Sequence, residues 1–160
     1  MIWNEIVSLA QVIATVAICA TFGVYYYQLR VMKRQLQMME RTSQSNALLS
    51  VVEQLSSSEM RQARKTLLQL KKPLSEWTEE EKHAAKKVCV QFDIIEILIK
   101  HKVVPSGMIE LHWGRTIRDC RKAANQLVDE IRLSIPSAWM EFDNLVARSV
   151  VTEQESRRTT

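Results

Sequence analysis

The sequence predicts an all-α protein, in which an N-terminal transmembrane helix continues into a stalk and is followed by a cytoplasmic bundle of about four to five helices. Three observations lead to this fold class. Only three glycines and three prolines occur in 160 residues, so local preference favours helices nearly throughout. Residues 6–27 contain no charged side chain. Further along, apolar positions recur at helical spacing between recognisable helix start and stop signals.

The charge-free segment has the length and the borders of a membrane-spanning helix. As a helix, its 22 residues would extend about 33 Å, which is enough to cross the hydrocarbon of a bilayer. Trp3 stands before it and three tyrosines close it, as is typical of residues at the two membrane interfaces. A cleaved signal peptide is the alternative, but no Lys or Arg precedes the segment and no A-x-A site follows it. We therefore assign residues 1–29 to a transmembrane anchor.

Basic residues predict the orientation of this anchor. None precedes the apolar segment, and four follow within fifteen residues of it, which places the N-terminus outside and the rest of the chain in the cytoplasm. These four residues lie in a segment that we assign to a basic stalk, over residues 30–46. We expect them to contact the membrane surface, so that the lipid bilayer is their partner. They are Arg30, Lys33, Arg34 and Arg41. The predicted location is single-pass in a bacterial inner (plasma) membrane.

Two stripes along the first helix suggest self-association. Small residues three or four apart let helix backbones approach closely, and here they are Ala10, Ala14, Ala17 and Thr21. Further on, the stalk shows a short heptad pattern, formed by Leu29, Met32, Leu36 and Met39. A homo-oligomer formed through both segments is therefore expected, and a monomeric anchor is the alternative.

The helical bundle is predicted over residues 47–150, with a flexible tail over 151–160. A capping box at Ser56 opens one helix and another at Thr78 opens the central helix, whose apolar face includes Phe92. We expect Phe92 and at least one tryptophan to be core residues. A further helix should run over residues 108–133, bent at Gly114, and a last one should begin at Ser137 after Pro136.

One ion pair is predicted inside this bundle. Arg64 lies on the helix that precedes the central one, and Asp93 and Glu96 form an i,i+3 pair on the central helix. We expect Arg64 to form a partly shielded salt bridge with one of these acids. A catalytic reading of the two carboxylates is the alternative.

The motifs of common enzymes are missing from the sequence. No histidine has an arginine four to six residues before it, as in ribonucleases of this size, and no H-x-x-x-H, C-x-x-C or glycine-rich phosphate loop occurs. Cys89 and Cys120 fall in helical patterns typical of core residues. We therefore expect a protein that is not an enzyme, with no catalytic, cofactor-binding or metal-binding residue. The near-balanced charge after residue 42 also disfavours nucleic acid as a partner.

Several short motifs resemble a known family. They are N-A-L-L at 46–49, S-S-E-M-R-Q-A-R at 57–64, A-A-K-K-V-C-V-Q-F-D at 84–93, H-W-G at 112–114 and S-A-W-M-E-F at 137–142. In this order and spacing they resemble a family of bacterial single-span membrane proteins whose cytosolic helical domain has no assigned function. The resemblance implies a helical bundle beside the membrane and carries over no site residues.

These observations lead to two expectations about function. The first is a membrane-anchored helical interaction or assembly module that binds an unidentified cytoplasmic protein. The alternative is an oligomeric membrane effector, or a pore-forming accessory protein of a bacterial antiviral system, which rests on likeness of layout alone.

Overall fold

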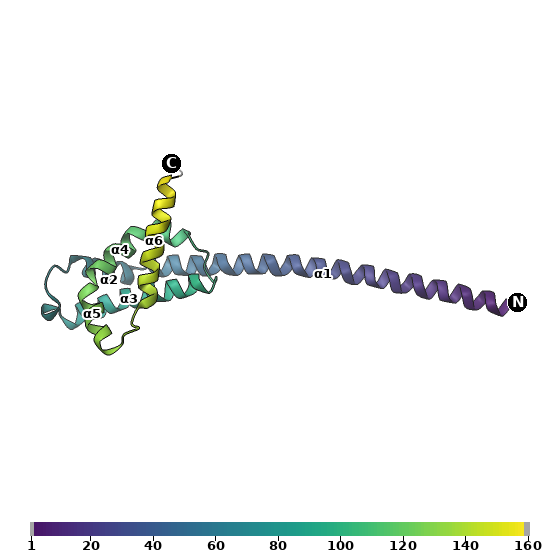
Figure 1. The fold of residues 1–160 in the computed structure, drawn as a ribbon, viewed down its shortest axis with the longest axis horizontal. Coiled ribbons are helices and arrows are strands. Elements are labelled where there is room, and N and C mark those ends of the chain that lie inside the picture. Colours follow the sequence, from purple (N-terminus) through teal and green to yellow (C-terminus); the bar gives the residue numbers. More distant parts are fainter. Residues whose placement is uncertain (1, 159–160) are drawn as a thin grey trace. The chain divides into compact units, whose positions relative to one another are not determined.

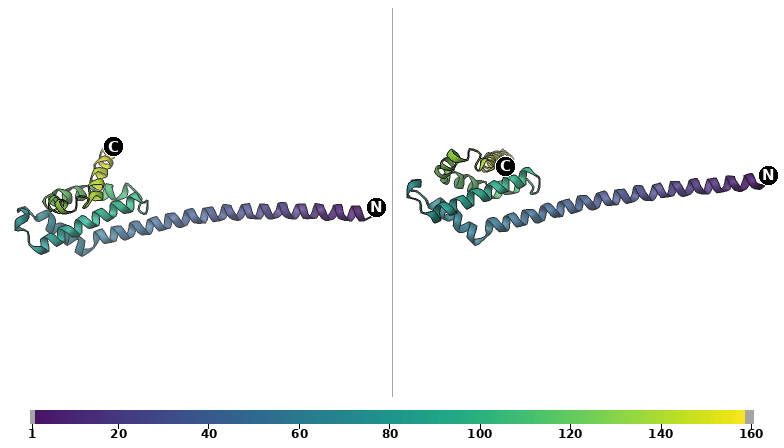
Figure 2. Two further views of the ribbon diagram at one scale, coloured as in Figure 1. Left: turned by 60° about the horizontal axis from the view of Figure 1, so that its bottom comes forward. Right: turned by 90° about the horizontal axis from the view of Figure 1, so that it is seen from below.

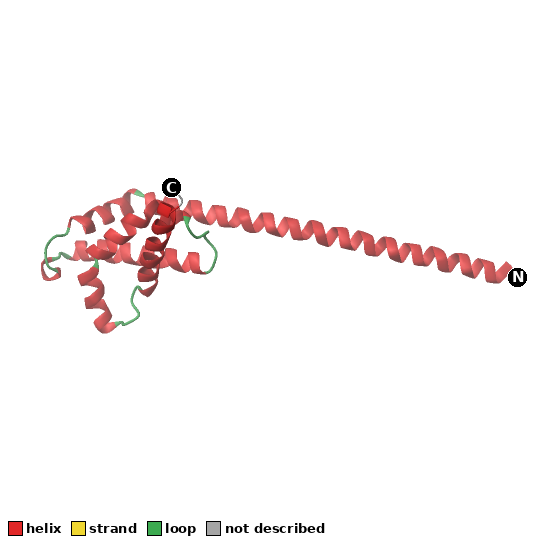
Figure 3. Cartoon of the chain, turned by 45° about the horizontal axis from the view of Figure 1, so that its top comes forward, coloured by secondary structure: helices red, strands yellow, loops and turns green. Residues whose placement is uncertain are grey.

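The structure is a computed structural model that describes the backbone of residues 2–158 and the side chains of residues 18–154 and 158. This part of the chain consists of α-helices, one short 3₁₀ helix and connecting loops, without a strand (Figures 1 and 3). The elements are α1 (Ile2–Ser56), α2 (Ser58–Gln69), η1 (Leu74–Glu76), α3 (Glu79–Lys100), α4 (Met108–Ala123), α5 (Asn125–Ser134) and α6 (Met140–Arg158). The all-helical part of the prediction is therefore confirmed.

The predicted transmembrane helix requires a correction. Among the described residues, no helix combines the length and the apolar character needed to cross a membrane. Side chains are described only from residue 18 onward, and from there the charge-free segment continues for just ten residues, whereas a spanning helix needs about 20. The predictions of a transmembrane anchor and of a single-pass location in a bacterial inner membrane are overturned by this finding and are not carried forward. Residues 1–17, including Ala10, Ala14 and Ala17, lie outside the described side chains.

The chain divides into two compact units, Met1–Thr42 and Ser43–Thr160. The first unit is helical, and the described side chains of residues 18–42 are all exposed except that of Val31, which is half-buried. The second unit contains the end of α1 and the helices α2 to α6, and it holds the apolar core. The two units are treated separately below.

The core of the second unit is built around α3. Figure 2 shows α3 running beside the last turns of α1, where Gln44 Nε2 donates a hydrogen bond to Lys102 O at 3.2 Å. Phe92 is fully buried and stacks on Phe142 of α6, with the ring centroids 5.2 Å apart. Trp77 is also a core residue. The expectation that Phe92 and at least one tryptophan lie in the core is therefore confirmed.

The helix starts follow local capping chemistry. Thr78 accepts a hydrogen bond from the Glu81 N–H, and the Glu81 carboxylate accepts one from the Thr78 N–H, which confirms the predicted capping box of the central helix. The capping box predicted at Ser56 is wrong, because α1 continues to Ser56 and the third residue of α2 is Met60, which has no carboxylate or amide to complete a box. It is the hydroxyl of Ser57 that accepts from the Met60 N–H and caps α2.

Three boundaries in the second half of the chain differ from the prediction. The single helix expected over residues 108–133 is two helices that meet at Ala124, and α4 runs without interruption through Gly114. The last helix begins at Met140 and not at Ser137, because Trp139 adopts a left-handed backbone conformation with φ of 52°. The residues after 150, which were assigned to a tail, continue α6 as helix to Arg158.

Replacing Phe92 by alanine tests the central position of α3. Because Phe92 is fully buried and stacked on Phe142, Phe92→Ala should lower the free energy of unfolding by about 3–5 kcal/mol. Urea denaturation followed by circular dichroism measures this change. The exposed neighbour Val90 provides the control, since Val90→Ala should change the free energy by less than about 0.5 kcal/mol. Equal effects of the two substitutions would show that Phe92 is not a core residue.

Candidate functional site

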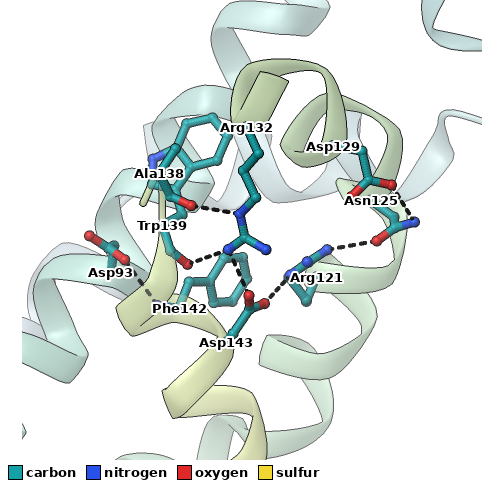
Figure 4. A network of polar contacts seen from close by, with 9 residues as sticks. All are labelled: Asp93, Arg121, Asn125, Asp129, Arg132, Ala138, Trp139, Phe142 and Asp143. Carbon is teal, nitrogen blue, oxygen red and sulfur yellow. Dashed lines mark hydrogen bonds and ion pairs between the residues drawn. The ribbon is translucent and has the colours of Figure 1, made fainter. Parts of the chain in front are cut away.

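A network of polar contacts surrounds the start of α6. The N–H groups in the first turn of a helix have no partner within the helix, and they attract negative charge. In α6 the N–H of Phe142 donates to Asp93 Oδ1 of α3 at 2.9 Å (Figure 4). Asp93 therefore caps a helix that begins almost fifty residues later in the sequence.

Asp143 joins three helices at the same place (Figure 4). Its Oδ1 accepts a hydrogen bond from Arg121 Nε of α4 at 2.5 Å, and its Oδ2 accepts one from Arg132 Nη2 of α5 at 2.6 Å. Burial favours the neutral form of Asp143, but the two arginines outweigh it and lower the pKa of the carboxyl below its ordinary value. Arg132 also donates to the carbonyls of Ala138 and Trp139, which holds the left-handed turn before α6.

A second cluster lies further along α6, where one arginine meets two buried carboxylates. Arg148 donates to both oxygens of Glu96, at 2.7 Å and 3.3 Å, and its Nε lies 3.6 Å from Glu110 Oε1. The side chains of Glu96 and Glu110 are 2% and 0% exposed. These hydrogen bonds raise the pKa of Arg148 above its ordinary value. The other oxygen of Glu110 accepts from the Gly107 N–H at the start of α4.

A cleft of about 330 Å³ opens beside this arginine. Its lining includes Arg148 and Glu96 together with Lys100 and Glu141, and the last two form an ion pair at 2.6 Å. The charged groups of the cleft are therefore already paired with one another. The arrangement fastens α6 to α3 and leaves no carboxylate of the cleft free for acid–base chemistry.

The predicted partner of Arg64 is wrong. Asp93 and Glu96 are engaged by α6, as described above, and neither contacts Arg64. The Arg64 guanidinium instead lies over the ring of Trp113 of α4, with 4.8 Å between Cζ and the ring centroid. Both acids are bound by α6 instead, Asp93 by a backbone N–H and Glu96 by Arg148.

A second hollow, a groove of about 650 Å³, lies between α2 and α3. Its walls carry charges of both signs, which include two ion pairs, Glu59 with Lys87 and Glu79 with Lys82. His83 lines the same groove and is exposed. No single type of charge dominates the groove, so it does not select a ligand class.

The residues assigned to a membrane surface lie on α1. The side chains of Arg30, Lys33, Arg34 and Arg41 are all exposed, as is that of Thr21. Their assignment depended on the adjoining transmembrane helix and is not carried forward. Their neighbours on α1 include large apolar side chains that are equally exposed, among them Leu29 and Leu36.

The buried cysteines are held as thiols. Burial raises the pKa of both Cys89 and Cys120 to about 12, so neither supplies a thiolate at neutral pH. Among the described residues, no group of three or more histidine, cysteine or acidic side chains is placed to hold a metal ion.

The comparison with protein families assigns the chain to a family of unknown function. A family model described as "Domain of unknown function (DUF4760)" matches residues 10–149, which is most of the chain. The chain belongs to this family. The match shows neither a membrane location, which the described helices do not support, nor a bacterial origin, which stays an expectation. No curated protein matches the chain, and no solved structure does.

Removing Arg148 from this DUF4760 domain should be strongly destabilising. Arg148→Met leaves the buried carboxylates of Glu96 and Glu110 without their cation, and the expected loss is about 3 kcal/mol or more in the free energy of unfolding. Urea denaturation at neutral pH measures it. Arg115→Met is the matched control, because Arg115 is 91% exposed and its loss should matter by less than about 0.5 kcal/mol. If both variants behave alike, the buried cluster does not hold α6.

The charge of Asp143 should make the stability of the DUF4760 domain dependent on pH. The pKa of Asp143 is lowered in the folded state. Its contribution to the free energy of unfolding is therefore present at pH values above the unfolded pKa of about 3.9, and it is lost as the pH falls through the pKa of the folded state. Asp143→Asn should therefore have a lower melting temperature than the wild type at about pH 5, and this gap in melting temperature should close towards about pH 2. Thermal melts across this range measure the gap. A gap that stays constant would assign the effect to packing and not to charge.

Proposed function

We propose that the chain is an assembly module, in which α1 of one copy pairs with α1 of a second copy and so brings two helical bundles together. The observation that supports this proposal is an apolar stripe on α1 that nothing in the described chain covers. Seven side chains follow one another at alternating spacings of four and three residues, and each is between 57% and 71% exposed. They are Ile18, Phe22, Tyr25, Leu29, Met32, Leu36 and Met39. We call them the α1 seam.

The spacing of the seam is that of a coiled coil. Apolar residues at positions a and d of a heptad form one face that meets the same face of another helix. With Leu29 at position a, all seven residues of the seam occupy a or d positions over three heptads. This pattern is longer than the four stalk residues noticed in the sequence, because Ile18, Phe22 and Tyr25 were first assigned to a transmembrane helix.

The charged residues of α1 are placed outside the seam. Arg30, Arg34 and Arg41 occupy the outer positions b and f, so a second copy would not bring arginines together. Lys33 and Glu40 occupy the flanking position e. In a parallel pair they lie opposite position g of the other copy, which is occupied by Gln28 and Gln35. An amide can accept a hydrogen bond from the lysine and donate one to the glutamate. In a parallel pair the flanks therefore contain no like-charged contact.

Within the second unit, the end of α1 packs in the core with heptad positions other than those of the seam. Within residues 43–56, the side chains of α1 that pack in the core are Ala47, Leu48, Val51 and Leu55, which occupy positions e, f, b and f of the same heptad. The residues at a and d in this segment are all exposed, namely Ser43, Asn46, Ser50 and Glu53. The same helix can thus serve the bundle with one face and a second copy with the other.

Helix energetics explain why a second copy is needed. A helix that packs against nothing is marginal in water, since most helical stability in proteins comes from burial of an apolar face. In the first unit, residues 18–42 bury no described side chain. Burial of one large apolar side chain contributes roughly 1.5–3 kcal/mol, so seven from each copy supply the missing stabilisation.

Cysteine cross-linking tests the seam. Met32→Cys, Leu36→Cys and Met39→Cys, each made in full-length protein with Cys19→Ser, should form disulfide-linked dimers under mild oxidation. A disulfide requires the two Cα atoms to lie within about 7 Å of each other. In a parallel pair, the equivalent a or d residues of the two copies come close to this distance, whereas residues at the outer positions do not. Non-reducing gel electrophoresis measures the linked fraction.

Two outer positions provide the controls for this experiment. Arg34→Cys and Met38→Cys are as exposed as the seam residues but lie at positions f and c, so they should link several-fold less. Cys89 and Cys120 are buried and should not contribute. Linkage that is absent from the seam, or equal at all five positions, would refute the pairing.

A further inference from the structure

Arg64 is a buried cation without a counterion in the described structure. Its side chain belongs to a residue that is only 6% exposed, and its Nη1 is buried without a hydrogen-bond partner. Among the described residues, no carboxylate forms an ion pair with it, whereas nine other basic side chains of the bundle do have such a partner. An unpaired buried charge is costly, because the group has lost its hydration and gained no opposite charge.

The neighbours of Arg64 compensate for its charge only in part. The face of Trp113 offers a cation–π contact, with Cζ 4.8 Å from the ring centroid. Burial lowers the pKa of Arg64, and the like charge of Arg61, one turn earlier on α2, lowers it further. Only the nearby thiol of Cys120 acts in the opposite direction, and burial keeps that thiol neutral at physiological pH.

We propose that Arg64 and Trp113 form the binding site for a carboxylate, supplied by a small molecule or by a partner protein. A guanidinium presents two parallel N–H groups that match the two oxygens of a carboxylate. The half-buried ring of Trp113 lies against the guanidinium and supplies an apolar wall. One carboxylate would balance the single buried charge, whereas a phosphate would bring a larger charge than this buried group can neutralise.

Thermal melting of the full chain with acetate as the probe tests the site. Because a ligand that binds only the folded state stabilises it, acetate at about ten times its dissociation constant should raise the melting temperature by about 5 °C. Sodium chloride at equal ionic strength should not. Arg64→Met should abolish the acetate effect, and Arg61→Met should retain it, since Arg61 is exposed.

The same variant reports on the unpaired charge itself. Without acetate, Arg64→Met should melt at a higher temperature than the wild type, because methionine fills the space of the side chain and needs no counterion. A lower melting temperature would show that the bundle already satisfies Arg64 and would overturn the proposal. An acetate effect that persists in Arg64→Met, or that chloride reproduces in the wild type, would overturn it as well.

Nuclear magnetic resonance gives a direct reading that does not depend on a variant. Acetate should shift the Nε–Hε signal of Arg64 and the indole N–H signal of Trp113 at one common dissociation constant, and unchanged signals would refute the site. N-acetylglycine carries its carboxylate after a peptide group, as the C-terminus of a protein does. If the site takes a chain end, N-acetylglycine should bind in place of acetate, and its amide, which lacks the carboxylate, should not. Phosphate that binds more tightly than either carboxylate would overturn the choice of ligand.

Discussion

Two carboxylates on α3 hold the last helix of the bundle in place. Asp93 accepts the Phe142 N–H at the start of α6, and Glu96, one turn further on, accepts two hydrogen bonds from Arg148. The remaining contacts of α6 depend on this placement, because it brings Phe142 onto Phe92 and Asp143 between two arginines. Where α6 crosses α4 the helices approach closely at Gly114, since a Cβ there would lie 3.3 Å from Ser149 Cβ and would require Ser149 to shift by a few tenths of an ångström.

The parts of the fold that were predictable from the sequence are those with local causes. The Thr78 capping box is complete within four residues, and the apolar face around Phe92 repeats along one helix. The break at Ala124 has no such signal, since neither glycine nor proline lies there. The start of α6 was misplaced because Arg132 holds the carbonyls of Ala138 and Trp139 in a turn that no local pattern announces.

The partners of the polar residues were not predictable, because they depend on which helices meet. Asp93 and Glu96 were recognised as acids that need basic or donor groups, but Arg64 was chosen because α2 precedes α3 in the chain. Arg148 lies 52 residues beyond Glu96, and no spacing rule reaches that far. The sequence predicts only the second part of the seam. Between residues 18 and 25, the same large apolar side chains fit both a heptad pattern and a membrane-spanning helix.

The long separation between α3 and α6 has a consequence for folding order. Contacts between residues far apart in sequence form late, because the intervening chain must first lose its freedom. α2 and α3 are joined by a short connection and can pack early, but Glu96 and Glu110 obtain their cation only when α6 has been synthesised and docks. On the ribosome, the growing chain would therefore hold an incomplete bundle with two carboxylates still hydrated, and the arrival of Arg148 would close it.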